Sequence, residues 1–116
     1  LKDALMNFGL GCQLLDDIRD MARDLLERRH NYVLSWLAHH QPATLDRLTA
    51  TTQRVDQRLY LDLPAVVLPV ARRGFDLMQS GLQALGDAGL DYNAGDARRM
   101  ADFMFTLLDL PELSHA

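Results

Sequence analysis

Apolar residues recur every three or four positions over most of the chain, which is the spacing of one face of an α-helix. The first such run extends from about Asp3 to His39, and the charged stretch between Asp24 and Asn31 is expected to bend or interrupt it. This part of the sequence therefore predicts one long helix or two shorter ones.

Three more helices are predicted after a break at residues 39–42. They extend from Thr44, as N-cap, to near Leu61, from Pro64 to Leu85, and from Asn93 to Pro111. In the middle one of the three, Pro69 either kinks the helix or marks its true beginning. The side of that helix expected to be buried consists of Val66, Val70, Leu77, Met78, Gly81 and Leu85.

The amino-acid composition indicates the fold class. The chain has 23 Leu and 13 Ala but only 5 Val, 1 Ile and 5 Thr, a mixture that favours helices over strands. Its 116 residues, 48% of them apolar, are enough for one domain with a packed core. The sequence therefore predicts a single all-α domain over residues 1–116.

Charge and cysteine content exclude several classes of function. The 12 basic residues are dispersed and the net charge is −4, which argues against nucleic acid as a partner. No apolar run approaches the ~20 residues of a membrane span, and no targeting pattern is present, so a cytoplasmic location is expected. Cys12 is the only cysteine and has no internal disulfide partner. Because the chain begins at Leu1, we expect it to be a piece of a longer protein.

The main candidate for chemistry is a row of polar side chains near the start of the chain. Six of them fall within an arc of roughly 100° on a helix: Gln13, Asp16, Asp17, Asp20, Asp24 and Glu27. Aspartates on successive turns repel one another, and a divalent cation would remove that cost. An all-oxygen set of ligands suits Mg²⁺. The same pattern is also that of a solvated acidic face, partly neutralised by Arg19 and Arg23.

These residues also resemble a known motif. Residues 13–20, Gln-Leu-Leu-Asp-Asp-Ile-Arg-Asp, resemble Q-x-x-D-D-x-x-D, the second aspartate-rich motif of class I isoprenoid synthases, and of the trans-prenyl diphosphate synthases in particular. Gly9 and Gly11 resemble the small residues that precede that motif, and Arg29 lies where the family often has a basic residue.

Two related groups of enzymes share part of this pattern. Asp16, Asp20 and Asp24 have the spacing of the metal-binding triad of terpene cyclases, although two of them depart from its Ser/Thr and Glu. Arg19, Asp20 and Asp24 resemble the R-D-x-x-x-D motif of squalene and phytoene synthases. The resemblance therefore leaves open whether the chemistry is condensation or cyclisation, as well as product chain length and oligomeric state, a homodimer included.

The resemblance implies an antiparallel all-α bundle, the terpene synthase fold, in which two aspartate-rich helices hold Mg²⁺ and the ions bind an allylic prenyl diphosphate. It implies a prenyltransferase of the polyprenyl synthetase type, acting in isoprenoid biosynthesis. The implied metal ligands are Asp16, Asp17, Asp20 and Asp24, and the expected diphosphate contacts are Gln13, Arg28 and Arg29.

No second aspartate-rich motif follows between Ile18 and Ala116. The expected entity is therefore the C-terminal part of such an enzyme, with half of an active site and no turnover on its own. A non-enzymatic helical interaction module is the alternative.

Overall fold

The computed structural model describes residues 2–89, and every regular element within that range is helical. The elements are α1 (Lys2–Arg19), α2 (Met21–Leu26), α3 (Tyr32–His40), α4 (Pro42–Thr51), a short 3₁₀ helix η1 (Leu59–Asp62) and α5 (Pro64–Asp87). For these residues, the all-α prediction is confirmed.

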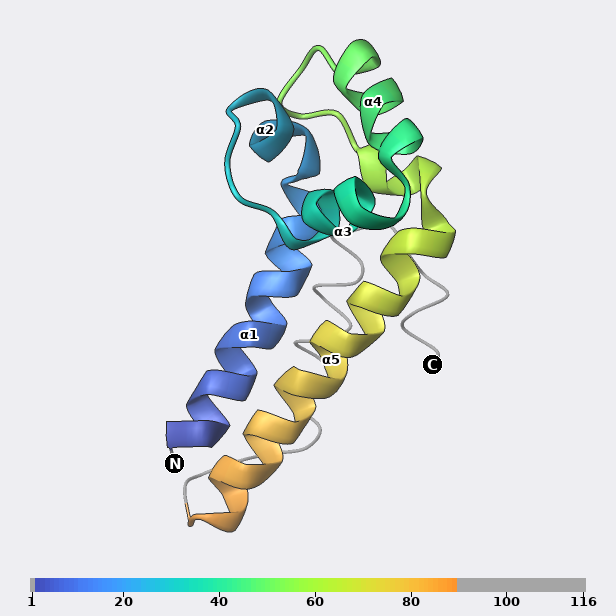
Figure 1. Ribbon diagram of the computed structural model, residues 1–116. Helices are drawn as coiled ribbons and strands as arrows, with labels where there is room; N and C mark the ends of the chain where they lie inside the picture. The colour runs from blue at the N-terminus through green and yellow to red at the C-terminus, as the bar shows by residue number, and fades with distance from the viewer. Residues whose placement is uncertain (1, 90–116) are drawn as a thin grey trace.

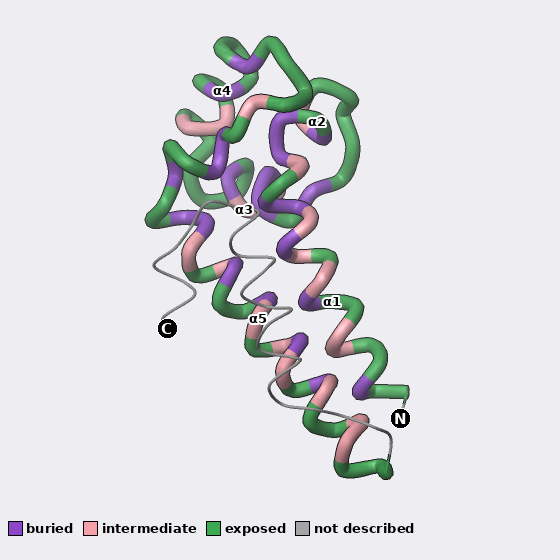
Figure 2. The backbone as a smooth tube through the Cα atoms, turned by 180° about the vertical axis from the view of Figure 1, so that it is seen from behind, coloured by how far each residue is buried: buried purple, intermediate pink, exposed green. Residues whose placement is uncertain are grey.

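The two longest helices, α1 and α5, lie side by side and antiparallel, with the start of α1 next to the end of α5 (Figure 1). Buried residues of both helices face each other along this pair (Figure 2). Leu15 and Ile18 of α1 belong to the same apolar core as Val67, Ala71 and Met78 of α5. Two positions of the apolar side predicted for α5, Met78 and Gly81, are thus buried against α1.

Glycines allow the backbones of α1 and α5 to approach closely. A Cβ atom added at Gly81 would lie 2.5 Å from the carbonyl oxygen of Ala4 and 2.8 Å from the backbone nitrogen of Phe8. One added at Gly11 would lie 2.6 Å from Cγ of Met78. These distances are shorter than van der Waals contact, so both positions require the smallest residue.

The remaining helices gather at one end of the α1–α5 pair, beyond the end of α1 (Figure 1). Their apolar side chains continue the core of the long pair: Met21, Ala22, Val33, Leu34, Leu37, Leu48, Leu59, Tyr60 and Leu63. The core therefore extends from the helix pair into this cap of short helices.

The structure corrects the predicted range of the helix after the break. It begins at Pro42, not Thr44, and ends at Thr51, about ten residues before Leu61. Proline takes the first helical position because its missing N–H has no partner to lose there. Past Thr51 the chain forms a loop in which the side-chain oxygen of Gln57 accepts hydrogen bonds from the backbone of Gln53 and Arg54.

The prediction for α5 is largely confirmed. The helix begins at Pro64 and continues through Pro69, which lies on its exposed side where water can solvate the carbonyl left without a donor. Val66, Met78 and Gly81 are buried as predicted, while Val70, Leu77 and Leu85 are only partly buried. The helix ends where expected, just before Gly89, whose φ of 89° is in the left-handed region.

Two further predictions concern the last helix of the chain and the absence of a membrane-spanning segment. The helix expected from Asn93 to Pro111 lies outside the described residues. Within residues 2–89, neither α1 nor α5 has the sustained apolar character that crossing a bilayer requires.

Candidate functional site

The predicted row of carboxylates lies where the first helix bends. Helix α1 ends at Arg19 and α2 begins at Met21, with Asp20 between them at φ −95° and ψ 15°. Helical hydrogen bonds still cross the junction, since the backbone nitrogens of Asp20 and Asp24 donate to the carbonyls four residues earlier, each over 2.8 Å. The row therefore continues across the bend instead of following one straight helix face.

Two of the four aspartates point into the protein. Asp17 is only 6% exposed, and its two carboxylate oxygens accept hydrogen bonds from the Gln13 side chain at 2.8 Å and the backbone nitrogen of Tyr32 at 2.9 Å. Asp24 is 8% exposed and accepts a 2.8 Å hydrogen bond from the Asn31 side chain. Both carboxylates join the bend to the start of α3.

Asn31 is the centre of this buried polar cluster, at 1% exposure. Its side-chain nitrogen donates to the backbone carbonyl of Asp17 at 2.7 Å and to the Asp24 carboxylate. Its side-chain oxygen accepts from the backbone nitrogens of Val33 and Leu34, at 2.9 and 3.2 Å, and so caps α3. One side chain thus fixes α1, α2 and α3 relative to each other.

The other two aspartates point outward. Arg19 lies between them and forms ion pairs with Asp16 at 2.8 Å and Asp20 at 3.3 Å. The side chains of Asp16 and Asp20 are 42% and 35% exposed, so water and solutes reach them. They are one helical turn apart, as the sequence predicts.

The expected diphosphate contacts Arg28 and Arg29 are exposed on the turn after α2. Arg28 has a φ of 56°, in the left-handed region, and Arg29 pairs with Glu27 at 2.9 Å. Gln13, the third expected contact, is exposed but hydrogen-bonded to Asp17. The structure therefore brings Gln13 next to one of the predicted aspartates. The backbone nitrogen of Arg29 donates to the carbonyl of Asp24 at 2.8 Å, but among residues 2–89 neither arginine side chain forms an ion pair with an aspartate.

A polar hollow of about 450 Å³ opens beside Asp20. Its walls come from the α1–α2 bend and from the loop that leads into η1: Arg19, Asp20, Arg23, Val55, Asp56, Gln57, Arg58 and Tyr60. The volume is within the range of about 300–1,000 Å³ of small-molecule sites. Sequence reasoning missed the Arg58 side of this hollow because over thirty residues separate it from the aspartates and no periodic pattern connects the two segments.

A second, apolar hollow of about 210 Å³ lies between α1, α3 and α5. It is lined by Leu14, Tyr32, Trp36, Ala65, Val66, Pro69, Val70 and Arg73. Leu14 is nearly opposite Asp16 on the helical wheel, so this hollow and the outward aspartates lie on different faces of α1.

The carboxylates fit a magnesium ion only in part. Among residues 2–89, no three histidine, cysteine or carboxylate side chains lie close enough together to hold a metal ion by themselves. Asp17 and Asp24 are engaged by buried donors, which leaves the outward pair Asp16 and Asp20. A pair is sufficient for the common mode of Mg²⁺ binding, in which one or two carboxylates and phosphate oxygens share the ion.

Cys12 lies one turn before Asp16 and is partly buried. Burial, and then the negative charge of Asp16, raise the pKa of its thiol above the ordinary value, although a backbone hydrogen bond opposes this. A raised pKa disfavours the thiolate, which is the reactive form. The side chain is therefore a packed thiol, with no sign of a nucleophile.

Comparison with known proteins finds no family model, no curated protein and no solved structure that matches the chain. The resemblance to class I isoprenoid synthases thus depends on the residues around Gln13–Asp20 and stays a prediction.

Proposed function

We propose that the chain is the C-terminal part of a class I isoprenoid synthase-like enzyme in which Mg²⁺ holds an allylic prenyl diphosphate for prenyl transfer. The observation that carries this proposal is the pair Asp16 and Asp20, one turn apart, solvent-accessible and beside a polar hollow. The resemblance to the motif indicates the class of reaction, and the positions of Asp16 and Asp20 are compatible with it.

Asp16 and Asp20 are the residues proposed to hold the ion. Bound there, Mg²⁺ would supply positive charge against the departing diphosphate. Arg19 already pairs with both aspartates, so it keeps their like charges from repelling each other before an ion arrives. With an ion held by this pair, Arg19 would lie close enough to add positive charge toward the anion. In this proposal Asp17 and Asp24 do not bind the ion. Their hydrogen bonds hold the bend between α1 and α2, and the bend positions Asp16 and Asp20.

The test uses the intact gene product and measures Mg²⁺-dependent release of pyrophosphate from an allylic diphosphate. Asp16→Asn is expected to lower this rate by at least 100-fold while the circular dichroism spectrum stays unchanged. Asp46→Asn, on the exposed side of α4, is the matched control and should change little. An Asp16→Asn protein with unchanged magnesium dependence would remove the proposal.

A second candidate, a helical interaction module, is favoured by one observation. Leu5, Met6 and Leu10 on α1 are 52–56% exposed and fall on one side of that helix. Large apolar side chains gathered on one face are typical of a surface that another helix or a partner covers. Concentration-dependent association of the 116-residue chain, abolished by Leu5→Lys with Leu10→Lys and accompanied by no magnesium binding, would favour this candidate over the enzyme.

A further inference from the structure

The apolar hollow between α1, α3 and α5 has the character of a small-molecule site. Its volume of about 210 Å³ exceeds the roughly 150 Å³ at which an apolar cavity holds a benzene ring. Of its eight described lining residues, seven are apolar or aromatic and only Arg73 is charged. Apolar walls with very few polar groups are typical of ligand sites. The hollow therefore fits an apolar body that carries a single charged group.

The aromatic wall of this hollow is held in place by contacts on its outer side. Tyr32 begins α3, and its backbone nitrogen donates to the Asp17 carboxylate at 2.9 Å. The Trp36 ring stacks on the His40 ring, with 4.5 Å between the ring centroids and 15° between the planes. Because the indole is already ordered in this way, a ligand that packs against it has less side-chain freedom to remove on binding.

The wall formed by α5 supplies two polar groups. Ala65, Pro69 and Arg73 are spaced four residues apart, so they follow one line along the helix. Pro69 has no N–H, and the carbonyl oxygen of Ala65 therefore lacks its usual helical donor. Arg73 is exposed, and among residues 2–89 it forms no ion pair. An open acceptor and an uncompensated cation thus lie about 12 Å apart along this wall.

The charge of the wall decides the kind of ligand. One guanidinium balances the single charge of a carboxylate and can bind it through two parallel hydrogen bonds, whereas a diphosphate would keep charge unbalanced. We propose that the hollow binds a small amphipathic carboxylate, with its alkyl chain against Leu14 and Trp36 and its carboxylate on Arg73. The site goes beyond the proposed function and does not depend on it, because the hollow and the outward aspartates lie on different faces of α1.

The test uses the fluorescence of Trp36, which is the only tryptophan of the chain and lines the hollow. The 116-residue chain is titrated with octanoate, below its micelle-forming concentration, at neutral pH and with EDTA present. A saturable change in emission is expected. Octanol has the same alkyl chain without the charge and should bind at least tenfold more weakly. Equal affinity for octanoate and octanol, or no saturable response to octanoate, would overturn the proposal.

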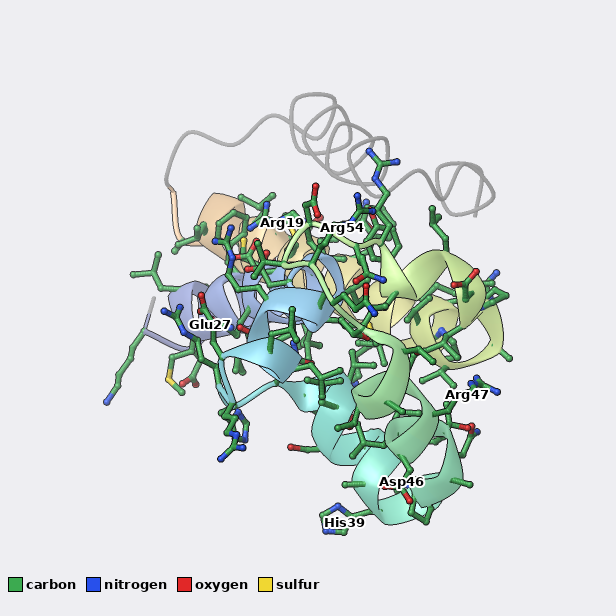
Figure 3. All side chains as sticks on the ribbon, turned by 90° about the horizontal axis from the view of Figure 1, so that it is seen from above. Arg19, Glu27, His39, Asp46, Arg47 and Arg54 are labelled. Carbon is green, nitrogen blue, oxygen red and sulfur yellow. The ribbon has the colours of Figure 1, made fainter. Side chains whose placement is uncertain are left out.

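Variants locate the site. Arg73→Gln is expected to weaken octanoate binding at least tenfold and to leave octanol binding unchanged. The matched controls are Arg72→Gln, an exposed neighbour outside the hollow, and Arg47→Gln, which lies on α4 (Figure 3), and each should change the affinity less than twofold. Equal losses at Arg72 and Arg73 would contradict the assignment.

A second variant tests the apolar part of the site. Ala65→Leu places a larger side chain on the wall of the hollow and should abolish the response to octanoate, while the circular dichroism spectrum stays unchanged. Undiminished binding in this variant would place the ligand elsewhere and overturn the proposal. Asp16→Asn separates this site from the proposed function, because that variant should lose magnesium-dependent turnover and keep its affinity for octanoate.

Discussion

The α1–α5 pair and the bend that follows α1 are held together by different physical means. Along the pair, glycines and apolar side chains bring two backbones into direct contact, and packing supplies the stability. At the bend, three helices meet around Asp17, Asp24 and Asn31, and buried hydrogen bonds supply the order. The candidate chemistry lies at the second region, where polar groups are held rigidly but water still reaches the outer face.

This difference shows how one row of aspartates serves two purposes. The inward carboxylates Asp17 and Asp24 determine the angle between α1 and α3, and the outward ones Asp16 and Asp20 stay accessible. A polar network with every member satisfied specifies geometry more strictly than apolar packing does. Substitutions in the two regions should therefore have different effects.

The largest effect is expected at Asn31. Asn31→Ala removes four hydrogen bonds, leaves the buried Asp24 carboxylate without a donor and uncaps α3, so the free energy of unfolding should fall by about 3–5 kcal/mol. Asn31→Ser keeps a capping oxygen and should recover about 1 kcal/mol of this. Urea denaturation measures both. Equal losses in the two variants would mean that capping contributes nothing.

The next largest effects are expected at two glycines, Gly81 on α5 and Gly9 on α1, where replacement by alanine should change the stability in opposite directions. Gly81→Ala places a methyl group against the backbone of Ala4 and Phe8 and should cost about 1–3 kcal/mol. Gly9→Ala meets nothing within 4 Å and should stabilise the protein by up to about 1 kcal/mol through helix propensity. Thermal unfolding of the two variants side by side checks this, and a stabilising Gly81→Ala would refute the close contact of the helices.

A third prediction separates the two kinds of aspartate. Asp17→Asn loses an acceptor for either Gln13 or the Tyr32 backbone and should reduce stability by about 1–2 kcal/mol while magnesium-dependent pyrophosphate binding stays within threefold. Asp16→Asn should do the reverse, with a stability change within about 0.5 kcal/mol and loss of that binding. If Asp17→Asn abolished binding in a stable protein, Asp17 would be a metal ligand, as the motif alone implies.

The smallest effect concerns Cys12. Because burial and the Asp16 charge raise the pKa of its thiol, labelling by an aromatic disulfide near pH 8 should be slow, and Asp16→Asn should accelerate it about twofold to threefold. The raised pKa also means that the contribution of this thiol to stability is complete below the ordinary thiol pKa and decreases as the pH rises through it. Asp46→Asn should leave the labelling rate unchanged.

Composition was enough to predict the all-α class that residues 2–89 show, and periodicity was enough to predict α5, whose buried residues extend from Val66 to Gly81. It failed at the end of α4, because the loop after Thr51 depends on the side chain of Gln57, which no local rule identifies. It also predicted one continuous polar face, whereas Asp17 and Asp24 point inward. Their donors come from Asn31 and Tyr32, and only the tertiary structure brings these close to the aspartates.

The central claim is that the outward aspartates and the hollow beside them form one binding region for a metal-bound diphosphate. Its most direct test is the NMR spectrum of the 116-residue chain with pyrophosphate and trace Mn²⁺, a paramagnetic substitute for Mg²⁺. The account predicts that the amide signals of Arg19, Asp20 and Gln57 broaden first, while that of Ala84 at the far end of α5 stays sharp. Broadening centred on Arg28 and Arg29, or uniform along the chain, would contradict it.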